Sequence, residues 1–150
     1  MTRVDFYLLE NAADGGQDAA VCKLTHKAFH LGHRIYILTS DLSHAQRLDR
    51  LLWTFSAGSF IPHGLTSELM ETPLPVLIGP EQPPPTFDDV LINLAPQVPE
   101  CFSRFQRVAE VIGGAETEKT QARDRFRFYR DRGYELQTHK LALDAQSVNA

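Results

Sequence analysis

The chain has 150 residues, a formal net charge of -4, and hydrophobic and charged contents of 43% and 23%, which is the balance of a globular protein. This length suits one domain with a buried core, and no apolar run approaches the roughly 18 residues of a membrane span. The start of the chain lacks the pattern of a secretory signal peptide. The two cysteines, Cys22 and Cys101, are too few for a disulfide scaffold or a zinc ribbon. We therefore expect a single domain in the reducing cytoplasm, without membrane association.

Charge is distributed unevenly along the sequence. Residues 119–140 contain seven basic and three acidic residues, a local charge of +4, whereas the rest of the chain contains eight basic and sixteen acidic residues, or -8. An acidic body with one basic segment does not suit broad contact with a nucleic-acid backbone. It predicts a local binding site for an anionic group.

Apolar runs and helical segments alternate along the chain. In order, they predict a buried strand over residues 4–9, a helix over 17–31 that Gly32 ends, a strand over 34–38, and a helix over 43–53 capped by Asp41 or Ser43. Short strands follow over 59–62 and 76–78, then strands over 90–94 and 105–112, a helix over 115–132 that Gly133 ends, and a short strand within 134–143.

This alternation is typical of the α/β class and predicts a mostly parallel central sheet with helices on both faces. We assign residues 1–143 to a single domain and residues 144–150 to a frayed C-terminal tail. The proline-rich segment 80–85 is interpreted as a surface loop inside that domain rather than as a linker.

Because such a fold resembles nucleotide-binding domains, the loop after the first strand is informative. Its Gly15-Gly16 pair has neither dinucleotide-binding spacing nor a following Lys and Ser/Thr. Asp14 and Asp18 would repel a phosphate at the start of the helix. The sequence therefore predicts a Rossmann-like fold without a working nucleotide site and without a cofactor.

Other chemistry-bearing patterns are weak. Cys22, His26 and His30 are spaced four apart on one helix, but a structural metal site needs further ligands, so we expect no metal. No nucleophile motif occurs, and Asp88-Asp89 before a strand is interpreted as a solvated turn. We expect no catalytic residues. A nucleotide-binding enzyme and a direct DNA-binding module that uses the basic helix remain as alternatives.

The last predicted helix carries the most informative pattern. At 100° per residue, Lys119, Arg123, Phe126 and Arg130 fall within about 60° of one another. This stripe is either a solvated basic face or a pocket for a peptide that carries both negative charge and an apolar side chain.

A second cluster combines Leu52-Trp53 with Phe60-Ile61-Pro62-His63. Apolar residues at this density are either ordinary core and loop or a partner surface on which Trp and Phe act as anchors.

Taken together, several segments give the sequence a family resemblance. They are Phe6-Tyr7-Leu8-Leu9, Gly32-His33-Arg34-Ile35, Leu52-Trp53, Ser59-Phe60-Ile61-Pro62-His63, Val90-Leu91-Ile92-Asn93-Leu94 and the arginine-rich string 123–130 leading into Gly133-Tyr134. In this order the segments resemble the chi subunit family of bacterial DNA polymerase III over residues 4 to about 140. The resemblance implies a non-catalytic replication adapter in the clamp-loader assembly. Such an adapter binds the acidic C-terminal tail of single-stranded DNA-binding protein and a second small subunit, psi, and meets DNA only indirectly.

Carried over by position, the resemblance implies two surfaces. The surface for the tail of single-stranded DNA-binding protein comprises Ile112, Lys119, Arg123, Phe126 and Arg127. The surface for psi, or for another replication or repair protein, comprises Trp53, Phe60, Ile61, Pro62 and His63. Phe126 stands where the family commonly has Tyr, which removes a hydroxyl and keeps the ring.

Overall fold

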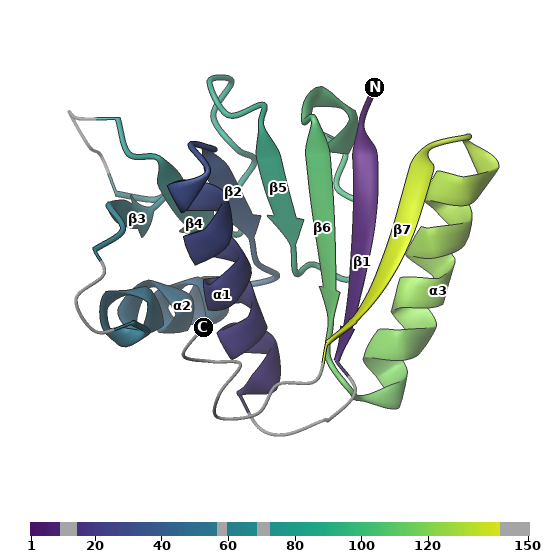
Figure 1. Cartoon of the computed structure of the whole chain (residues 1–150), viewed down its shortest axis with the longest axis horizontal. Helices are drawn as coiled ribbons and strands as arrows, with labels where there is room; N and C mark the ends of the chain where they lie inside the picture. The colour runs from purple at the N-terminus through teal and green to yellow at the C-terminus, as the bar shows by residue number, and fades with distance from the viewer. Residues whose placement is uncertain (10–14, 57–59, 69–72, 142–150) are drawn as a thin grey trace.

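The structure is a computed structural model that describes residues 1–9, 15–56, 60–68 and 73–141 (Figure 1). Its strands are β1 (Arg3–Leu9), β2 (Ile35–Leu38), β3 (His63–Leu65), β4 (Val76–Gly79), β5 (Val90–Asn93), β6 (Arg107–Ile112) and β7 (Glu135–Leu141). Its helices are α1 (Gly16–His30), α2 (Leu42–Thr54) and α3 (Glu116–Asp131), with a short 3-10 helix, η1, over Phe102–Arg104. None of the helices in these ranges combines the length and hydropathy of a membrane span.

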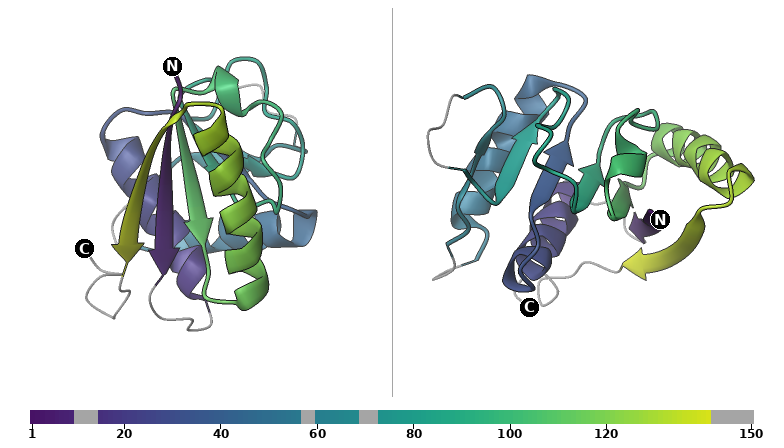
Figure 2. Two further views of the ribbon diagram at one scale, coloured as in Figure 1. Left: turned by 90° about the vertical axis from the view of Figure 1, so that its right-hand side faces the viewer. Right: turned by 90° about the horizontal axis from the view of Figure 1, so that it is seen from above.

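The strands form one seven-stranded sheet in the order β3-β4-β2-β5-β6-β1-β7, and every pairing is parallel. Helices α1 and α2 pack on one face and α3 on the other (Figure 2). The predicted α/β fold with a parallel sheet and helices on both faces is therefore confirmed. The strand nearest the C-terminus, β7, lies at the sheet edge beside β1, the strand nearest the N-terminus.

Each face of the sheet has its own apolar core. On the α1 and α2 side, side chains such as Val21, Leu48 and Ile37 are fully buried. On the α3 side, Tyr129 shares one apolar cluster with Phe87, from the connection between β4 and β5, and with Phe102 and Phe105, from the connection between β5 and β6. These two connections cover part of the face where a helix would otherwise lie, and Arg104 joins them by donating to the carbonyl oxygens of Pro83 and Pro84. The proline-rich stretch is thus part of the domain, as predicted.

The predicted helix ends agree with the structure. Gly32 and Gly133 both have a left-handed backbone, with φ of 91° and 81°. Behind α3, the Tyr134 N–H donates to the Tyr129 carbonyl at 3.1 Å, which satisfies a carbonyl that the helix leaves open. At the N-terminus of α2, the Asp41 side chain accepts a hydrogen bond from the His44 N–H at 2.8 Å and caps the helix.

Two strand predictions were wrong in position. The strand expected over residues 59–62 is absent at 60–62, residue 59 lies outside the described residues, and β3 begins only at His63. Pro62 has no N–H to donate to a ladder, and parallel pairing with β4 starts from His63 opposite Val76. The strand expected from residue 105 begins at Arg107, because η1 and its following turn occupy the preceding residues. The predicted tail at 144–150 also lies outside the described residues.

A buried polar network joins α3 to the sheet. The Glu110 carboxylate is completely buried on β6 and accepts hydrogen bonds from Arg125 Nε at 2.9 Å, the Tyr129 hydroxyl at 2.8 Å and Asn93 Nδ2 at 2.9 Å. Burial raises the pKa of Glu110, and the Arg125 charge opposes that rise. The second arm of Arg125 donates to the Pro96 carbonyl at 2.8 Å. These bonds fix both the height and the rotation of α3 over the sheet.

We expect Arg125→Met to lower the free energy of unfolding by about 3–5 kcal/mol, since it leaves the Glu110 carboxyl buried without its cation. The matched control is Arg130→Met on the same helix, where an exposed ion pair with Asp131 is lost and the cost should stay below about 1 kcal/mol. Urea denaturation at neutral pH measures both values. Equal destabilisation by the two substitutions would contradict the proposed importance of the network.

Candidate functional site

A surface groove of about 420 Å³ lies between α3 and the end of the sheet formed by β6, β1 and β7. We call it the α3 groove, and it is lined by Phe6, Leu8, Leu9, Ile112, Gly113, Lys119, Ala122, Arg123, Phe126, Thr138 and Lys140. Four of the five residues predicted for tail binding therefore line one groove. The fifth, Arg127, is exposed outside it and pairs with Asp124. Arg130, the last residue of the predicted stripe, also lies outside and pairs with Asp131.

The arginines of the C-terminal segment have different surroundings. Arg125 is buried against Glu110, Arg127 and Arg130 pair with aspartates, and Arg132 lies 4.2 Å from the centre of the Phe128 ring. Arg123 is exposed and makes no hydrogen bond or ion pair with any residue in the described ranges. Its charge is consequently available to a ligand.

Lys119 provides the second cation of the groove. Its ammonium lies 3.8 Å from the Glu116 carboxylate one turn earlier, and that glutamate is 82% exposed. An exposed pair at this distance contributes little, so the lysine can exchange this partner for a ligand carboxylate at small cost. Lys140 reaches the groove from β7 and adds a third positive charge.

The floor of the groove is apolar. Ile112 is 2% exposed and Phe6 is equally buried, so both form the base rather than the rim. The half-buried Phe126 ring meets Phe6 edge to face, with ring centres 5.3 Å apart. An apolar side chain entering the groove would therefore meet a ring face and an aliphatic base, with cations on one wall.

A tight turn sets the entrance to α3. The Gly113 N–H donates to Glu118 Oε2 at 3.0 Å, and Gln17 of α1 approaches the same oxygen at 3.4 Å. A Cβ added at Gly113 would lie 2.7 Å from this carboxylate, so a larger residue would displace it. The hydrogen bond between Gly113 and Glu118 holds the first turn of α3, and with it Lys119, against the end of β6.

Sequence reasoning missed several groove residues. Phe6, Leu8, Thr138 and Lys140 come from β1 and β7, which are more than a hundred residues apart in sequence and pair in parallel. Leu136, Thr138 and Lys140 alternate along a predicted strand, so the sequence could have shown that they lie on one face of it. Only the pairing of β7 with β1 shows which groove that face lines.

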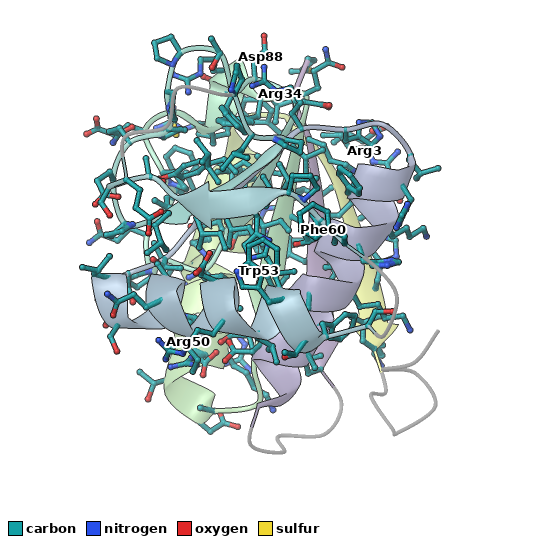
Figure 3. All side chains as sticks on the ribbon, turned by 90° about the vertical axis from the view of Figure 1, so that its left-hand side faces the viewer. Arg3, Arg34, Arg50, Trp53, Phe60 and Asp88 are labelled. Atoms are coloured by element: carbon teal, nitrogen blue, oxygen red, sulfur yellow. The ribbon has the colours of Figure 1, made fainter. Side chains whose placement is uncertain are left out.

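The second predicted surface divides into exposed and buried residues. Trp53 on α2 and Phe60 are 48% and 65% exposed, and their ring centres are 5.3 Å apart (Figure 3). We call these two residues the Trp53 patch. Beneath them, the centres of the His63 and Trp53 rings are 4.1 Å apart. His63 and Ile61 are both buried, at 5% and 3% exposed.

The buried members therefore position the patch. His63 Nε2 lies 2.8 Å from the Asp49 carbonyl and Nδ1 lies 2.6 Å from the Ile61 carbonyl, which joins α2 to the start of β3. Pro62 is half-buried between these two residues. Trp53 and Phe60 are the members that a partner could contact.

At the start of α1, a carboxylate occupies the region where a nucleotide-binding domain would hold phosphate. Asp18 is buried and accepts from Arg47 Nε at 2.6 Å, and His44 Nε2 lies 2.8 Å from its other oxygen. Burial alone would raise the pKa of Asp18, but the hydrogen bonds and charges of His44 and Arg47 lower it to about 2. At the start of α1, His44 and Arg47 are thus already paired with an internal carboxylate. Asp14, the other predicted obstacle to phosphate, lies outside the described residues.

Other chemistry-bearing residues form no evident centre. Within the described ranges, no group of three or more His, Cys, Asp and Glu side chains is placed to share a metal ion. Nε2 of His26 and Nε2 of His30 approach to 3.3 Å, while Cys22 points into the core, where burial raises its pKa to about 12. A thiol in that environment stays protonated and unreactive.

Fold and groove together define a small parallel α/β protein with a cationic, apolar-floored surface groove. A sequence model described as "DNA polymerase III chi subunit, HolC" matches residues 1–137. DNA polymerase III subunit chi of Pseudomonas aeruginosa is 40% identical over 141 residues, which cover 94% of this chain and 98% of that protein. The Escherichia coli K12 protein of the same name is 32% identical, covering 92% and 97%.

The chain therefore belongs to the DNA polymerase III chi subunit family, and is an accessory subunit in DNA replication. Among solved structures, T4 UvsW superposes with a TM-score of 0.67 at 10% identity, over 94% of this chain and 42% of that one. At this identity the likeness concerns the fold alone, and the chain spans less than half of UvsW.

The Asp18 cluster predicts a dependence of stability on pH. Because the folded pKa of Asp18 is depressed to about 2, its ionised form stabilises the fold above the unfolded pKa near 3.8, and this contribution is lost as the pH falls toward 2. We expect Asp18→Asn to be about 2 kcal/mol less stable than wild type at pH 5, with the difference disappearing near pH 2. Urea denaturation over this pH series measures it. Asp131→Asn, an exposed carboxylate on α3, is the control, and a gap that stays constant with pH would refute the assignment.

Proposed function

We propose that this chi subunit is a non-catalytic adapter. Its α3 groove binds the acidic C-terminal tail of single-stranded DNA-binding protein, and its Trp53 patch binds psi or another replication or repair protein. Through these two contacts the adapter connects the tail to the clamp loader in the cytoplasm and meets DNA only through its protein partners.

The observation that carries this proposal is the exposed Arg123, which has no ion-pair partner in the described part of the chain, beside a half-buried Phe126 ring in one groove. Tails of single-stranded DNA-binding proteins in this system typically carry several Asp residues and end in Phe with a free carboxylate, as the family resemblance implies. Such a peptide needs an apolar slot and fixed cations at the same place. The α3 groove offers Ile112 and Phe126 for the ring, and Arg123 and Lys119 for the carboxylates.

The magnitudes favour a moderate affinity. Burying the terminal ring contributes roughly 2 kcal/mol, and each charge-assisted hydrogen bond to Arg adds roughly 1.5–3 kcal/mol before the peptide is ordered. After the cost of ordering the peptide, a net binding free energy near -8 kcal/mol, or about micromolar, is reasonable. Since the cations are partly exposed, salt should weaken the complex.

As the family resemblance implies, Phe126 stands where related chains commonly have Tyr. Phe126 supplies the ring without a hydroxyl, so the ring contact with Phe6 and the apolar slot are retained. The carboxylates then depend entirely on the cations, which raises the relative importance of Arg123.

We expect Arg123→Ala to weaken binding of a fluorescent tail peptide at least tenfold, because the substitution removes the guanidinium that would pair with a carboxylate of the peptide. Fluorescence anisotropy at fixed low salt measures the dissociation constant. Arg130→Ala is the matched control: it removes the same charge about two turns along α3 from a residue that already pairs with Asp131. Deleting the terminal Phe of the peptide should nearly abolish binding to wild type.

Equal affinities of wild type and Arg123→Ala would remove α3 from the binding site. Failure of wild type to bind any acidic, Phe-ended peptide would reject the tail-binding function itself. Arg130→Ala should change the affinity less than about twofold, consistent with general charge screening.

The Trp53 patch supports the second contact. Its two rings expose apolar surface next to each other on α2 and the segment before β3, while Ile61 and His63 hold them from below. Large aromatic residues held rigidly in this way are typical anchors of protein interfaces.

We expect Phe60→Ala to abolish the complex with psi and to leave tail-peptide affinity unchanged, because a 65% exposed ring contributes little to folding. Isothermal titration calorimetry with purified psi measures the first effect and anisotropy the second. Leu42→Ala, which removes a 42% exposed apolar side chain at the far end of α2, is the control. Retained psi binding by Phe60→Ala, with the fold intact by circular dichroism, would exclude the patch.

The absence of catalysis is also part of this proposal. The pairing of Arg47 and His44 with Asp18 supports it, because these two side chains at the start of α1 are already bound to an internal carboxylate and not available to a phosphate. Titration calorimetry with ATP, GTP and NAD tests it directly, and micromolar binding at the start of α1 would favour a nucleotide-dependent enzyme instead.

A further inference from the structure

Two strands of the seven-stranded sheet, β1 and β7, extend past the covering helices on one face in the described part of the chain. Helices α1 and α2 pack over β2, β3, β4 and β6, whereas β1 and β7 continue beyond α1 toward the sheet edge (Figure 2). Strands of a parallel sheet are normally covered on both faces. This region is therefore an open position in the helical layer.

The side chains on this face are suited to partial exposure. The half-buried rings of Tyr7 and His139 stack with centres 4.8 Å apart and planes 17° apart. Asp5 is fully buried between them and the strand ends, and it is held by Arg107 at 2.8 Å and His139 at 3.0 Å. The Asp5 carboxylate beneath the face is thus already paired.

A second groove, of about 460 Å³, runs between α1 and this face, and we call it the α1 groove. Along the α1 wall, half-buried Leu24 and Ala28 are followed by Leu31 directly after the helix, at spacings of four and three residues, while Ala20 one turn earlier is buried in the core. Leu31 is 67% exposed, which is a large apolar exposure for a residue at the end of a helix. This spacing is that of a helix face that packs against another helix.

The charges around the α1 groove are of one sign. Lys23, Lys27, Arg107 and Lys140 line it, and its lining includes no Asp or Glu. In the described ranges, Lys23, Lys27 and Lys140 form no ion pair. A chain with a net charge of -4 therefore places unpaired cations on both sides of an apolar strip.

We propose that the α1 groove receives an acidic amphipathic helix of a partner protein, lying beside α1 in the open position of the helical layer. Its apolar face packs on Leu24, Ala28 and Leu31, and its flanking carboxylates pair with Lys23 and Lys27 on one side and with Lys140 on the other. Helix-in-groove docking uses this combination of an apolar strip and flanking charge. The site shares only Lys140 with the lining of the α3 groove, and it shares no residue with the Trp53 patch.

Two features favour a helix over single-stranded nucleic acid. Most of the floor is aliphatic, and the two aromatic rings in it, Tyr7 and His139, stack on each other. The spacing of the apolar positions also follows α1, which a parallel or antiparallel helix can match over several turns.

The test uses a synthetic helical peptide of about 18 residues, roughly five turns, with Leu at positions i, i+4 and i+7 and Glu on both flanks. Its control replaces every Glu by Lys. We expect the acidic peptide to bind with a dissociation constant in the high-micromolar range and to shift amide NMR signals of α1, β1 and β7. The basic peptide should not bind.

Matched variants separate charge from apolar contact. Lys27→Glu should weaken binding at least fivefold. Arg50→Glu makes the same charge change at an exposed position on α2 and should have less than a twofold effect. Leu31→Ala should weaken binding similarly, and Leu42→Ala should not. The Arg123→Ala variant should bind the helix normally, which keeps this site distinct from the α3 groove.

Several outcomes would overturn the proposal. They are no binding of the acidic peptide up to millimolar concentration, equal binding of the basic peptide, and identical effects of Lys27→Glu and Arg50→Glu. Stronger binding of an oligothymidine than of the peptide in this groove would identify a nucleic-acid site instead. Self-association that Leu31→Ala abolishes, measured by sedimentation, would identify an interface between two copies of this chain.

Discussion

The buried carboxylate of Glu110 is the constraint on which the α3 side of the molecule depends. A charge placed in a core is tolerated only when its bonds are fully satisfied. Arg125 and Tyr129 from α3 and Asn93 from β5 satisfy it together. Since two of these donors are four residues apart on one helix, they fix the rotation of α3, and that rotation decides which side chains face outward.

The same rotation sorts the basic residues of the helix into different roles. Arg125 points inward to the carboxylate, and Arg123, two residues earlier, points toward the groove, as a helix of 3.6 residues per turn requires. Phe126 then stands beside Arg123 over the Phe6 ring. A stabilising interaction inside the core thus preorganises the surface that we propose as the tail-binding site, without any contact to the ligand.

An adapter gains from surfaces that do not compete. The α3 groove lies at the β7 end of the sheet and the Trp53 patch lies beside β3, the opposite edge strand. A parallel sheet holds its two edges at a fixed separation, so partners at the two edges can be bound together. The parallel sheet supplies a rigid frame, and at the start of α1 the Asp18 carboxylate is paired with His44 and Arg47. The function that we propose accordingly lies in side chains at the two edges rather than in the fold.

The sequence by itself determined the α/β class, the helix ends at Gly32 and Gly133, and the association of Lys119, Arg123 and Phe126, because each follows from local periodicity and local backbone preference. It could not determine that Arg125 is buried, since that depends on Glu110 from a different element. It placed the third strand too early, because ladder pairing with β4, not apolar content, sets where β3 begins. Only the tertiary structure paired β7 with β1, which brought Thr138 and Lys140 to the α3 groove and left the α1 groove open on the other face. Strand pairing joins residues distant in the chain, and a single sequence carries no local signal for it.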